Sequence, residues 1–283
     1  MQSLKRPDFT ARATLKLCVE SIRDKDLAAR LDAIAPLVDQ AESEYLARAA
    51  KAEWYKIDAT PTVGDLRVDE MKRLYKGTFV KSVGTRNIYD AIKKQPKNDI
   101  CPLCAQRTVS TLDHYLPQTG HPALVITAVN LVPACQECNK IKLATTADTP
   151  NQQTLHPYFD DVDAERWLQA TVMEGNPVAI RFSVAPSEKW DEIIACRVER
   201  HFKLFDLAAL YASHSAVEVE GMRHALQQIA LRGHAEAVRD YLKELATSWA
   251  QSHRNGWRVA TYEALAASDW FCASFASMAM TAS

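Results

Sequence analysis

Two cysteine pairs constrain the fold of this 283-residue chain more than any other feature of its sequence. The segments CPLC and CQEC hold four of its seven cysteines, Cys101, Cys104, Cys135 and Cys138. The short spacing within each pair lets both thiolates bind the same ion. Two such pairs complete a tetrahedral shell of sulfur atoms around Zn²⁺, at about 2.3 Å per bond. We therefore predict one zinc ion that joins segments far apart in the sequence.

A closed four-sulfur shell has no open position, so we expect this zinc to be structural and not catalytic. Two redox-active pairs are the alternative, but neither lies in the strand–helix–strand context typical of thioredoxin-like proteins. The odd number of cysteines and an N-terminus without the apolar core of a signal peptide disfavour a disulfide framework. We expect the three single cysteines to be small buried hydrophobic residues: Cys18, Cys196 and Cys272.

Composition narrows the classes of protein to consider. Hydrophobic residues make up 47% of the chain and charged residues 24%, which is ordinary for soluble globular proteins. The formal net charge is −1, so a nucleic-acid site must be a local basic patch. No uninterrupted apolar run approaches the length of a membrane span, about 18 residues. We therefore expect a cytoplasmic protein without a membrane partner.

Sequence patterns divide the chain into three regions. Residues 1–66 have the apolar spacing of helices, with Pro36 producing either a kink or two shorter helices. Residues 67–160 hold both cysteine pairs and a basic lead-in. Residues 161–283 begin with alternating apolar positions on both sides of an Asn-Pro turn, which predicts a β-hairpin, and continue with helical patterns. The expected fold class is mainly α, with a central zinc module and a small β-hairpin.

The basic lead-in runs from Arg67 to Lys97 and contains nine basic residues against three acidic ones. A solvated helix face is one explanation of this excess. The other is an arm that contacts phosphate groups, in which Lys93 and Lys94 would bind nucleic acid.

Residues that can perform chemistry lie between and just after the cysteine pairs. Asp113 offers a hard oxygen ligand and His114 a nitrogen base. Neighbouring side chains on a strand point to opposite faces, so these two share a site only where the strand bends or ends, as Pro117 allows. Asn139, just past the second pair, offers a further oxygen. Oxygen ligands with open positions suit Mg²⁺ or Mn²⁺ better than zinc.

The order CPLC, LDHYLP, VNLVPACQECNKIK resembles the zinc-bearing branch of the HNH (ββα-metal) endonucleases, over roughly residues 98–145. The resemblance implies a ββα-metal module in which His114 is the general base that activates water. It implies that Asp113 and Asn139 hold a catalytic Mg²⁺ or Mn²⁺. It also implies that Asn130 braces the loop that orients the histidine. The last motif position is commonly histidine in this family, and Asn139 keeps an oxygen ligand there.

Four further segments resemble the HNH subunit of Septu-type anti-phage systems: LYKGTFVK, NIYDAIKK, HPYFDDV and NGWRVATYEAL. This resemblance implies a role in antiviral defence beside an ATPase protein partner. Lys140, Lys142 and His156 are additional candidates for nucleic-acid contact. The alternatives are two solvated lysines and a histidine hydrogen-bonded in a packed turn.

The expected function is metal-dependent hydrolysis of phosphodiester bonds in nucleic acid, with DNA as the expected substrate and RNA or tRNA left open. One alternative is a zinc-stabilised nucleic-acid-binding module without catalysis. The other is a subunit whose helical flanks dock an ATPase.

Overall fold

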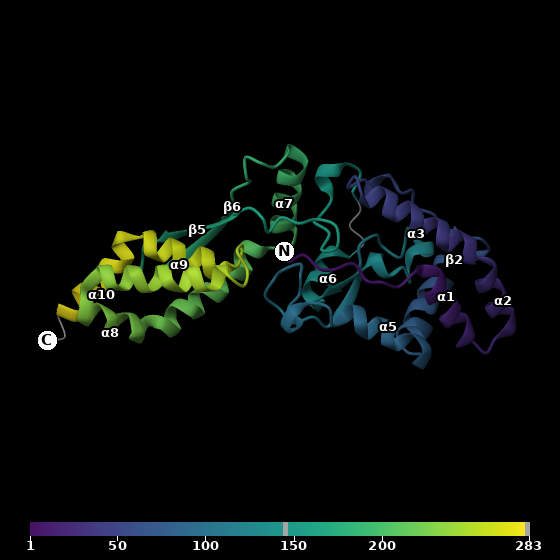
Figure 1. The fold of residues 1–283 in the computed structure, drawn as a ribbon, viewed down its shortest axis with the longest axis horizontal. Coiled ribbons are helices and arrows are strands. Elements are labelled where there is room, and N and C mark those ends of the chain that lie inside the picture. Colours follow the sequence, from purple (N-terminus) through teal and green to yellow (C-terminus); the bar gives the residue numbers. More distant parts are fainter. Residues whose placement is uncertain (144–146, 281–283) are drawn as a thin grey trace. The chain divides into compact units, whose positions relative to one another are not determined.

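The computed structural model describes residues 1–143 and 147–280, with side chains described as far as Phe275. Across these residues the protein is mainly helical, with small antiparallel hairpins. The chain divides into two compact units, Met1–Asp161 and Val162–Ser283, and each is described by itself (Figure 1).

Three helices begin the first unit: α1 (Ala11–Glu20), α2 (Lys25–Ala33) and α3 (Ala35–Ala49). The hydroxyl of Thr10 accepts a hydrogen bond from the first turn of α1, which satisfies one of its free N–H groups. Pro36 lies in the first turn of α3, where a proline costs no helical hydrogen bond. It therefore separates two helices and does not kink one.

Short elements then lead toward the cysteine pairs. A two-stranded hairpin turns at Gly64, whose φ of +57° is a conformation that glycine adopts without strain. The elements are β1 (Thr62–Val63), β2 (Leu66–Arg67), α4 (Val68–Arg73), the π-helical turn η2 (Leu74–Phe79) and α5 (Val83–Lys93).

A hydrophobic core joins the N-terminal helices to later segments of the first unit. Leu15 of α1 and Val38 of α3 pack in the same buried cluster as Phe79, Ile92 and Leu131. Residues 1–66 and the segment around the cysteine pairs therefore fold around shared apolar side chains.

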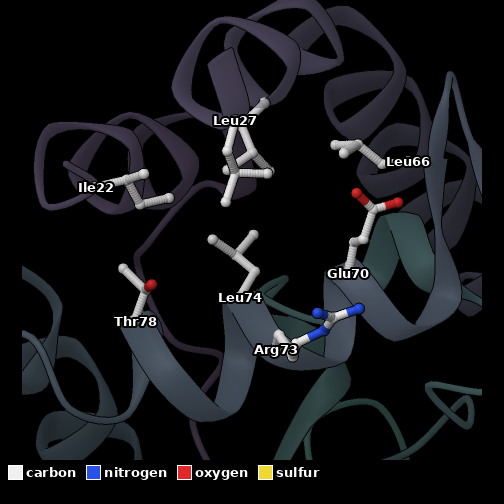
Figure 2. Close-up of a pocket in the computed structure, with 8 residues that line it drawn as sticks. Ile22, Leu27, Leu66, Glu70, Arg73, Leu74 and Thr78 are labelled. Carbon is white, nitrogen blue, oxygen red and sulfur yellow. The ribbon is translucent and has the colours of Figure 1, made fainter. Parts of the chain in front are cut away.

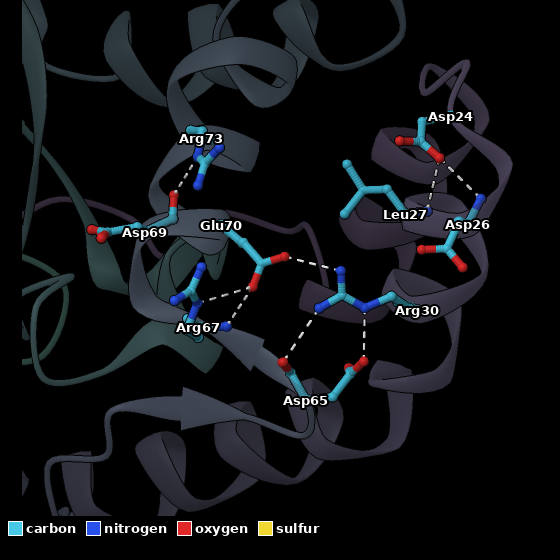
Figure 3. A network of polar contacts seen from close by, with 9 residues as sticks. All are labelled: Asp24, Asp26, Leu27, Arg30, Asp65, Arg67, Asp69, Glu70 and Arg73. Atoms are coloured by element: carbon cyan, nitrogen blue, oxygen red, sulfur yellow. Dashed lines mark hydrogen bonds and ion pairs between the residues drawn. The ribbon is translucent and has the colours of Figure 1, made fainter.

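An ion-pair network on the surface joins α2 to the start of α4 (Figure 3). Arg30 Nε donates to Asp65 Oδ2 at 2.7 Å, and its Nη1 donates to Glu70 Oε1 at 3.0 Å. The other oxygen of Glu70 accepts from the main-chain N–H of Arg67 at 2.9 Å, so Glu70 also caps α4. The carboxylates of this network offset part of the positive charge at the start of the basic lead-in.

The second unit begins with the hairpin that the sequence predicted. β5 (Leu168–Met173) and β6 (Ala179–Val184) pair antiparallel over their whole length. The helices that follow are α7 (Glu192–Leu204), α8 (Leu207–Ala250), α9 (Trp257–Ala267) and α10 (Asp269–Met280). Gly233 and His234 have non-helical backbone angles and divide α8 into two segments. Among the described residues, none of the helices is both long and apolar enough to cross a membrane.

Candidate functional site

A hairpin followed by a helix carries most of the residues that the sequence singled out. β3 (Thr111–His114) pairs antiparallel with β4 (Leu131–Ala134), and His114 lies opposite Leu131. α6 (Gln136–Lys142) begins just after β4 and packs against β3. All of β4 is buried, as expected for a short apolar strand inside a domain.

Four thiols converge where this hairpin meets the segment before it. Their sulfur atoms lie within 4.8 Å of one another, and all four residues are buried: Cys101, Cys104, Cys135 and Cys138. Cys135 is also the N-cap of α6, and its Sγ accepts from the N–H of Cys138 at 3.4 Å. The thiol of Cys101 holds the pKa of Cys104 far below its ordinary value. Four buried thiols at this spacing fit Zn²⁺, whose tetrahedral sulfur shell has edges of about 3.8 Å.

His114 is buried at the end of β3. Its Nε2 lies 2.8 Å from the main-chain oxygen of Val125, and its Nδ1 lies 3.0 Å from Nε2 of Gln118. A carbonyl oxygen only accepts, so Nε2 donates the proton and Nδ1 accepts from the Gln118 amide. The Tyr75 ring packs edge-on at 4.6 Å between centroids. Burial lowers the pKa of His114 to about 4, so the ring is neutral near neutral pH, with its lone pair on Nδ1.

Asn130, fully buried, closes the loop between β3 and β4. Its Oδ1 accepts from the N–H of Leu116 at 2.8 Å, and its Nδ2 donates to the oxygens of Leu116 and Leu124 at 3.2 Å. The residue after Leu124 is Val125, which accepts from His114. Asn130 therefore fixes the loop that in turn holds the histidine ring.

Asp113 is buried and paired with Lys142. Lys142 Nζ lies 3.1 Å from Asp113 Oδ2, and each side chain is 5% exposed. The same ammonium donates to the main-chain oxygens of His114 and Tyr115 at 2.7 and 2.8 Å. Burial raises the pKa of Asp113, and the charge of Lys142 opposes that rise. Lys142, expected at the surface as a nucleic-acid contact, thus lies inside the protein, because oxygen acceptors there replace its hydration.

Asn139 lies on α6 three residues before Lys142, so the two side chains leave the same face of the helix. That face packs against β3, since Lys142 reaches Asp113 from it. Asn139 itself is half-buried. Strand and helix thus place the Asp113 carboxylate and the Asn139 amide on facing elements.

His156 differs from the expectation of a phosphate contact. It is fully buried, and its ring stacks on Trp54 at 5.1 Å between centroids. Its Nδ1 accepts from the N–H of Tyr158 at 3.2 Å, and its Nε2 lies 2.8 Å from the Tyr45 hydroxyl. The aromatic residues around it occupy the space that a phosphate group would need, so the alternative of a packed histidine describes its position.

The remaining basic candidates lie at or near the surface. Lys94 and Lys140 are at least partly exposed, and Lys93 is half-buried at the end of α5. These three side chains are thus placed where a phosphate group can approach.

Two neighbours of His114 were not anticipated from the sequence. Gln118 occupies the Nδ1 side of the ring, and Tyr75 packs against it from the π-helical turn. Gln118 lies in the polar segment after Pro117, where the strand was expected to end. The sequence therefore indicated that Gln118 follows the strand but not that it bonds to His114. Tyr75 lies in LYKGTFVK, a segment singled out only for its resemblance.

A cavity of about 170 Å³ lies elsewhere in the first unit, between the N-terminal helices and the segment formed by α4 and η2 (Figure 2). Leu27 and Leu74 face each other across it, and Glu70 and Arg73 line one wall. Glu70 already takes part in the network of Figure 3. None of the residues expected to perform chemistry lines this cavity.

Comparison with known proteins identifies a distant relative. The chain is 26% identical over 299 aligned residues to protein ea31 of Escherichia phage lambda, covering 96% of this chain and 99% of that protein. The similarity therefore extends through both units. No family model matches the chain, and no solved structure matches it.

Proposed function

We propose that this protein is an HNH-type endonuclease that hydrolyses phosphodiester bonds in nucleic acid, with DNA as its substrate. The observation that carries this proposal is the state of His114. It is a neutral histidine whose Nδ1 lone pair is fixed in direction at the end of a strand. The histidine lies on a ββα arrangement that also carries the four-thiol cluster.

His114 has the features of a general base. Val125 and the loop held by Asn130 fix the ring, so its Nδ1 lone pair points in one direction. The Gln118 amide occupies that direction in this structure, so a reacting water molecule takes its place. His114 then accepts the water proton at Nδ1 while the water oxygen attacks phosphorus, and the P–O bond to the leaving oxygen breaks as that oxygen takes a proton from solvent. A positioned base of this kind contributes about 10² to 10⁴ in rate.

Two residues with hard oxygen atoms are close to the proposed base in the fold: Asp113 precedes it on β3, and Asn139 lies on α6, which packs against β3. The Asp113 carboxylate and Asn139 amide are the side chains that would hold Mg²⁺ or Mn²⁺, and these donors suit such ions. An observation of the structure supports this fit, because the Asp113 carboxylate already binds one cation, the ammonium of Lys142. A divalent ion bound there would stabilise charge on the scissile phosphate and the leaving oxygen.

The narrower proposal is a nuclease subunit of an anti-phage defence complex with an ATPase partner. Two of the segments that carry this resemblance lie near the candidate site. LYKGTFVK supplies Tyr75, which touches His114. HPYFDDV supplies Tyr158, whose hydroxyl donates to Leu131 of β4 at 2.9 Å. Purification of this chain with the product of the neighbouring gene tests the partner, and a failure to associate leaves the nuclease proposal intact.

A non-catalytic zinc-stabilised nucleic-acid-binding module is the second candidate. It is favoured by the fact that His114 and Asp113 already have hydrogen-bonding partners inside the protein. Measuring both cleavage and nucleic-acid binding, as in the His114→Ala test below, separates the two functions.

The test is the His114→Ala variant, which removes the base but none of the four thiols. It should keep its zinc and its nucleic-acid affinity while cleavage falls by at least about 10²-fold. Asn139→Ala should also cleave more slowly and recover partly at high Mg²⁺ or Mn²⁺, whereas His114→Ala should not recover.

The matched control is His224→Ala, which removes an exposed histidine of α8. It should cleave at the wild-type rate. The wild type must first show metal-dependent cleavage, alone or with its partner. If His114→Ala then cuts at the normal rate, the proposed mechanism is wrong. If the assembled wild type binds nucleic acid without cutting it, the binding module becomes the preferred function.

A further inference from the structure

The ammonium of Lys142 lies in a shell of oxygen atoms. Its Nζ is 3.1 Å from Asp113 Oδ2 and 2.7 and 2.8 Å from the main-chain oxygens of His114 and Tyr115. An ammonium has three N–H donors, and these oxygens are acceptors within their reach. The Lys142 side chain is only 5% exposed, so protein oxygens take the place of water around the charge.

A carboxylate and main-chain carbonyls are also the ligands that a hard divalent ion prefers. Two cations cannot share this shell, because like charges a few ångströms apart repel strongly where water is excluded. We propose that Lys142 is the resident cation of this oxygen site and that a divalent ion binds Asp113 only by displacing it. This regulation rests on the proposed function, in which Asp113 and Asn139 hold the catalytic ion.

The exchange of cations also affects the proposed base. One oxygen of the shell is the carbonyl of His114, so Lys142 supports the main chain from which that ring extends. With Lys142 in place, the charge of Asp113 is neutralised and the end of β3 is held. With a divalent ion in place of Lys142, the site would carry the positive charge that stabilises the scissile phosphate. Lys142 is therefore a positioning residue. Its displacement links the binding of a divalent ion at Asp113 to the support of the main chain at His114.

The first experiment measures Mn²⁺ binding to the zinc-loaded full-length protein by electron paramagnetic resonance, without nucleic acid. Lys142→Met removes the competing charge and keeps much of the side-chain volume. Its Mn²⁺ affinity should rise by at least about tenfold, which is about 1.4 kcal/mol. Lys140→Met, on the same helix but nearer the surface, should bind Mn²⁺ as the wild type does. The double variant Asp113→Asn/Lys142→Met should lose the gain.

The second experiment uses the unaltered protein, because Lys142→Met leaves a buried carboxylate without its partner and can fail to fold. Brief acetylation followed by mass spectrometry reports the accessibility of each lysine. Lys142 should react much more slowly than Lys140 in the absence of Mn²⁺. Saturating Mn²⁺ should raise the labelling of Lys142 several-fold and leave that of Lys140 unchanged.

Two results would overturn the competition between cations. One is a folded Lys142→Met protein that binds Mn²⁺ no more tightly than Lys140→Met. The other is a Lys142 that stays protected from acetylation when Mn²⁺ is saturating. If Mn²⁺ binds neither the wild type nor the variants, the proposal also fails. The first two results leave the nuclease proposal standing, because Mn²⁺ still binds, whereas a protein that binds no Mn²⁺ contradicts the proposed metal site as well.

Discussion

The two units of this protein differ in how closely their buried polar side chains cluster. Around β3 and α6 of the first unit, the buried groups are matched to specific main-chain or side-chain partners: Asp113 and His114 on the strand, Lys142 on the helix and Asn130 in the loop. In the second unit, helices α8 and α9 pack extensively on each other, and several ion pairs lie near the surface, such as that of Arg239 with Asp269. Buried polar groups there are more scattered; one of them is Asn255, whose Oδ1 accepts from the N–H of Trp167 at 2.9 Å. The first arrangement depends on individual partners, whereas the second depends more on apolar area.

The difference predicts that single substitutions act locally and severely in the first unit. Ion pairs with exposed members contribute little to stability, while a buried group that loses its partner bears the full cost of its desolvation. Matched substitutions in the two units test this difference, and those that leave a buried group without its partner should have the larger effects.

Loss of one proposed zinc ligand should have the largest effect. The protein should contain about one zinc per chain, and structural zinc contributes on the order of 10 kcal/mol or more to folding. Cys138→Ser should therefore unfold the segment around β3, β4 and α6. Hydrogen exchange measured by mass spectrometry should rise there and remain low in α8.

The control for this variant is Cys196→Ser, a half-buried single cysteine of α7. It should keep the zinc content and exchange pattern of the wild type. A Cys138→Ser protein with normal zinc and normal exchange would show that the four thiols do not form a structural metal site.

Substitution in the aromatic cluster should come next. Trp54 is 1% exposed and contacts both His156 and Tyr115 at ring-centroid distances of 5.1 and 5.0 Å. Trp54→Ala should lower the free energy of unfolding by about 3 to 5 kcal/mol because it leaves a cavity. Trp249→Ala removes a partly exposed ring of α8 and its cation–π interaction with Arg258, and should cost clearly less, about 1 to 2 kcal/mol. Equal destabilisation of the two variants in urea denaturation would contradict the comparison.

The buried His114 should make stability depend on pH. Its pKa in the folded protein, about 4, lies below its ordinary value, near 6.5. The unfolded chain therefore takes up a proton at a pH where the folded protein does not, so stability is retained above about pH 6.5 and falls toward pH 4. Between about pH 7 and pH 5, the wild type should lose about 2 kcal/mol more than His114→Gln. Urea denaturation at each pH measures this, and parallel pH profiles would show that His114 is not buried in its neutral form.

Charge reversal in the basic lead-in should have the smallest effect on folding. Lys93→Glu/Lys94→Glu should leave the unfolding free energy nearly unchanged but weaken nucleic-acid binding. The slope of log affinity against log salt should become shallower by about 0.9 for each phosphate group that the variant no longer neutralises. Lys203→Glu/Lys243→Glu, which alters two exposed lysines of the second unit, is the control. Equal affinities and slopes in both variants would show that Lys93 and Lys94 do not contact phosphate and belong to a solvated helix face.

Local patterns were the most reliable guide to this fold. Alternating apolar residues around a turn predict the hairpin of β5 and β6, and Pro36 marks the boundary between α2 and α3. The meeting of the four cysteines is predictable as well, because the spacing within each pair already favours a shared ion. The turn and the proline act on residues close in sequence, and the cysteines are recognisable because few other side chains bind zinc through sulfur.

Lys142 and His156 illustrate what local patterns miss. A lysine at the end of a helix is ordinarily solvated, and nothing adjacent in the sequence indicates that Asp113 and two carbonyl oxygens will surround it. His156 likewise depends on Tyr45 and Trp54, about one hundred residues earlier in the chain.

The residue types available for chemistry and the segments that carry them can be read from the amino-acid sequence: the thiols, the Asp113-His114 pair, and Asn130 and Asn139. Tertiary structure alone decided which of these side chains would be paired, buried or open. Burial depends on packing between distant segments, and a buried charge or hydrogen-bonding group is tolerated only when such packing supplies its partner. The neutral state of His114 and the interior position of Lys142 therefore result from packing in the folded protein and could not be read from the sequence motif.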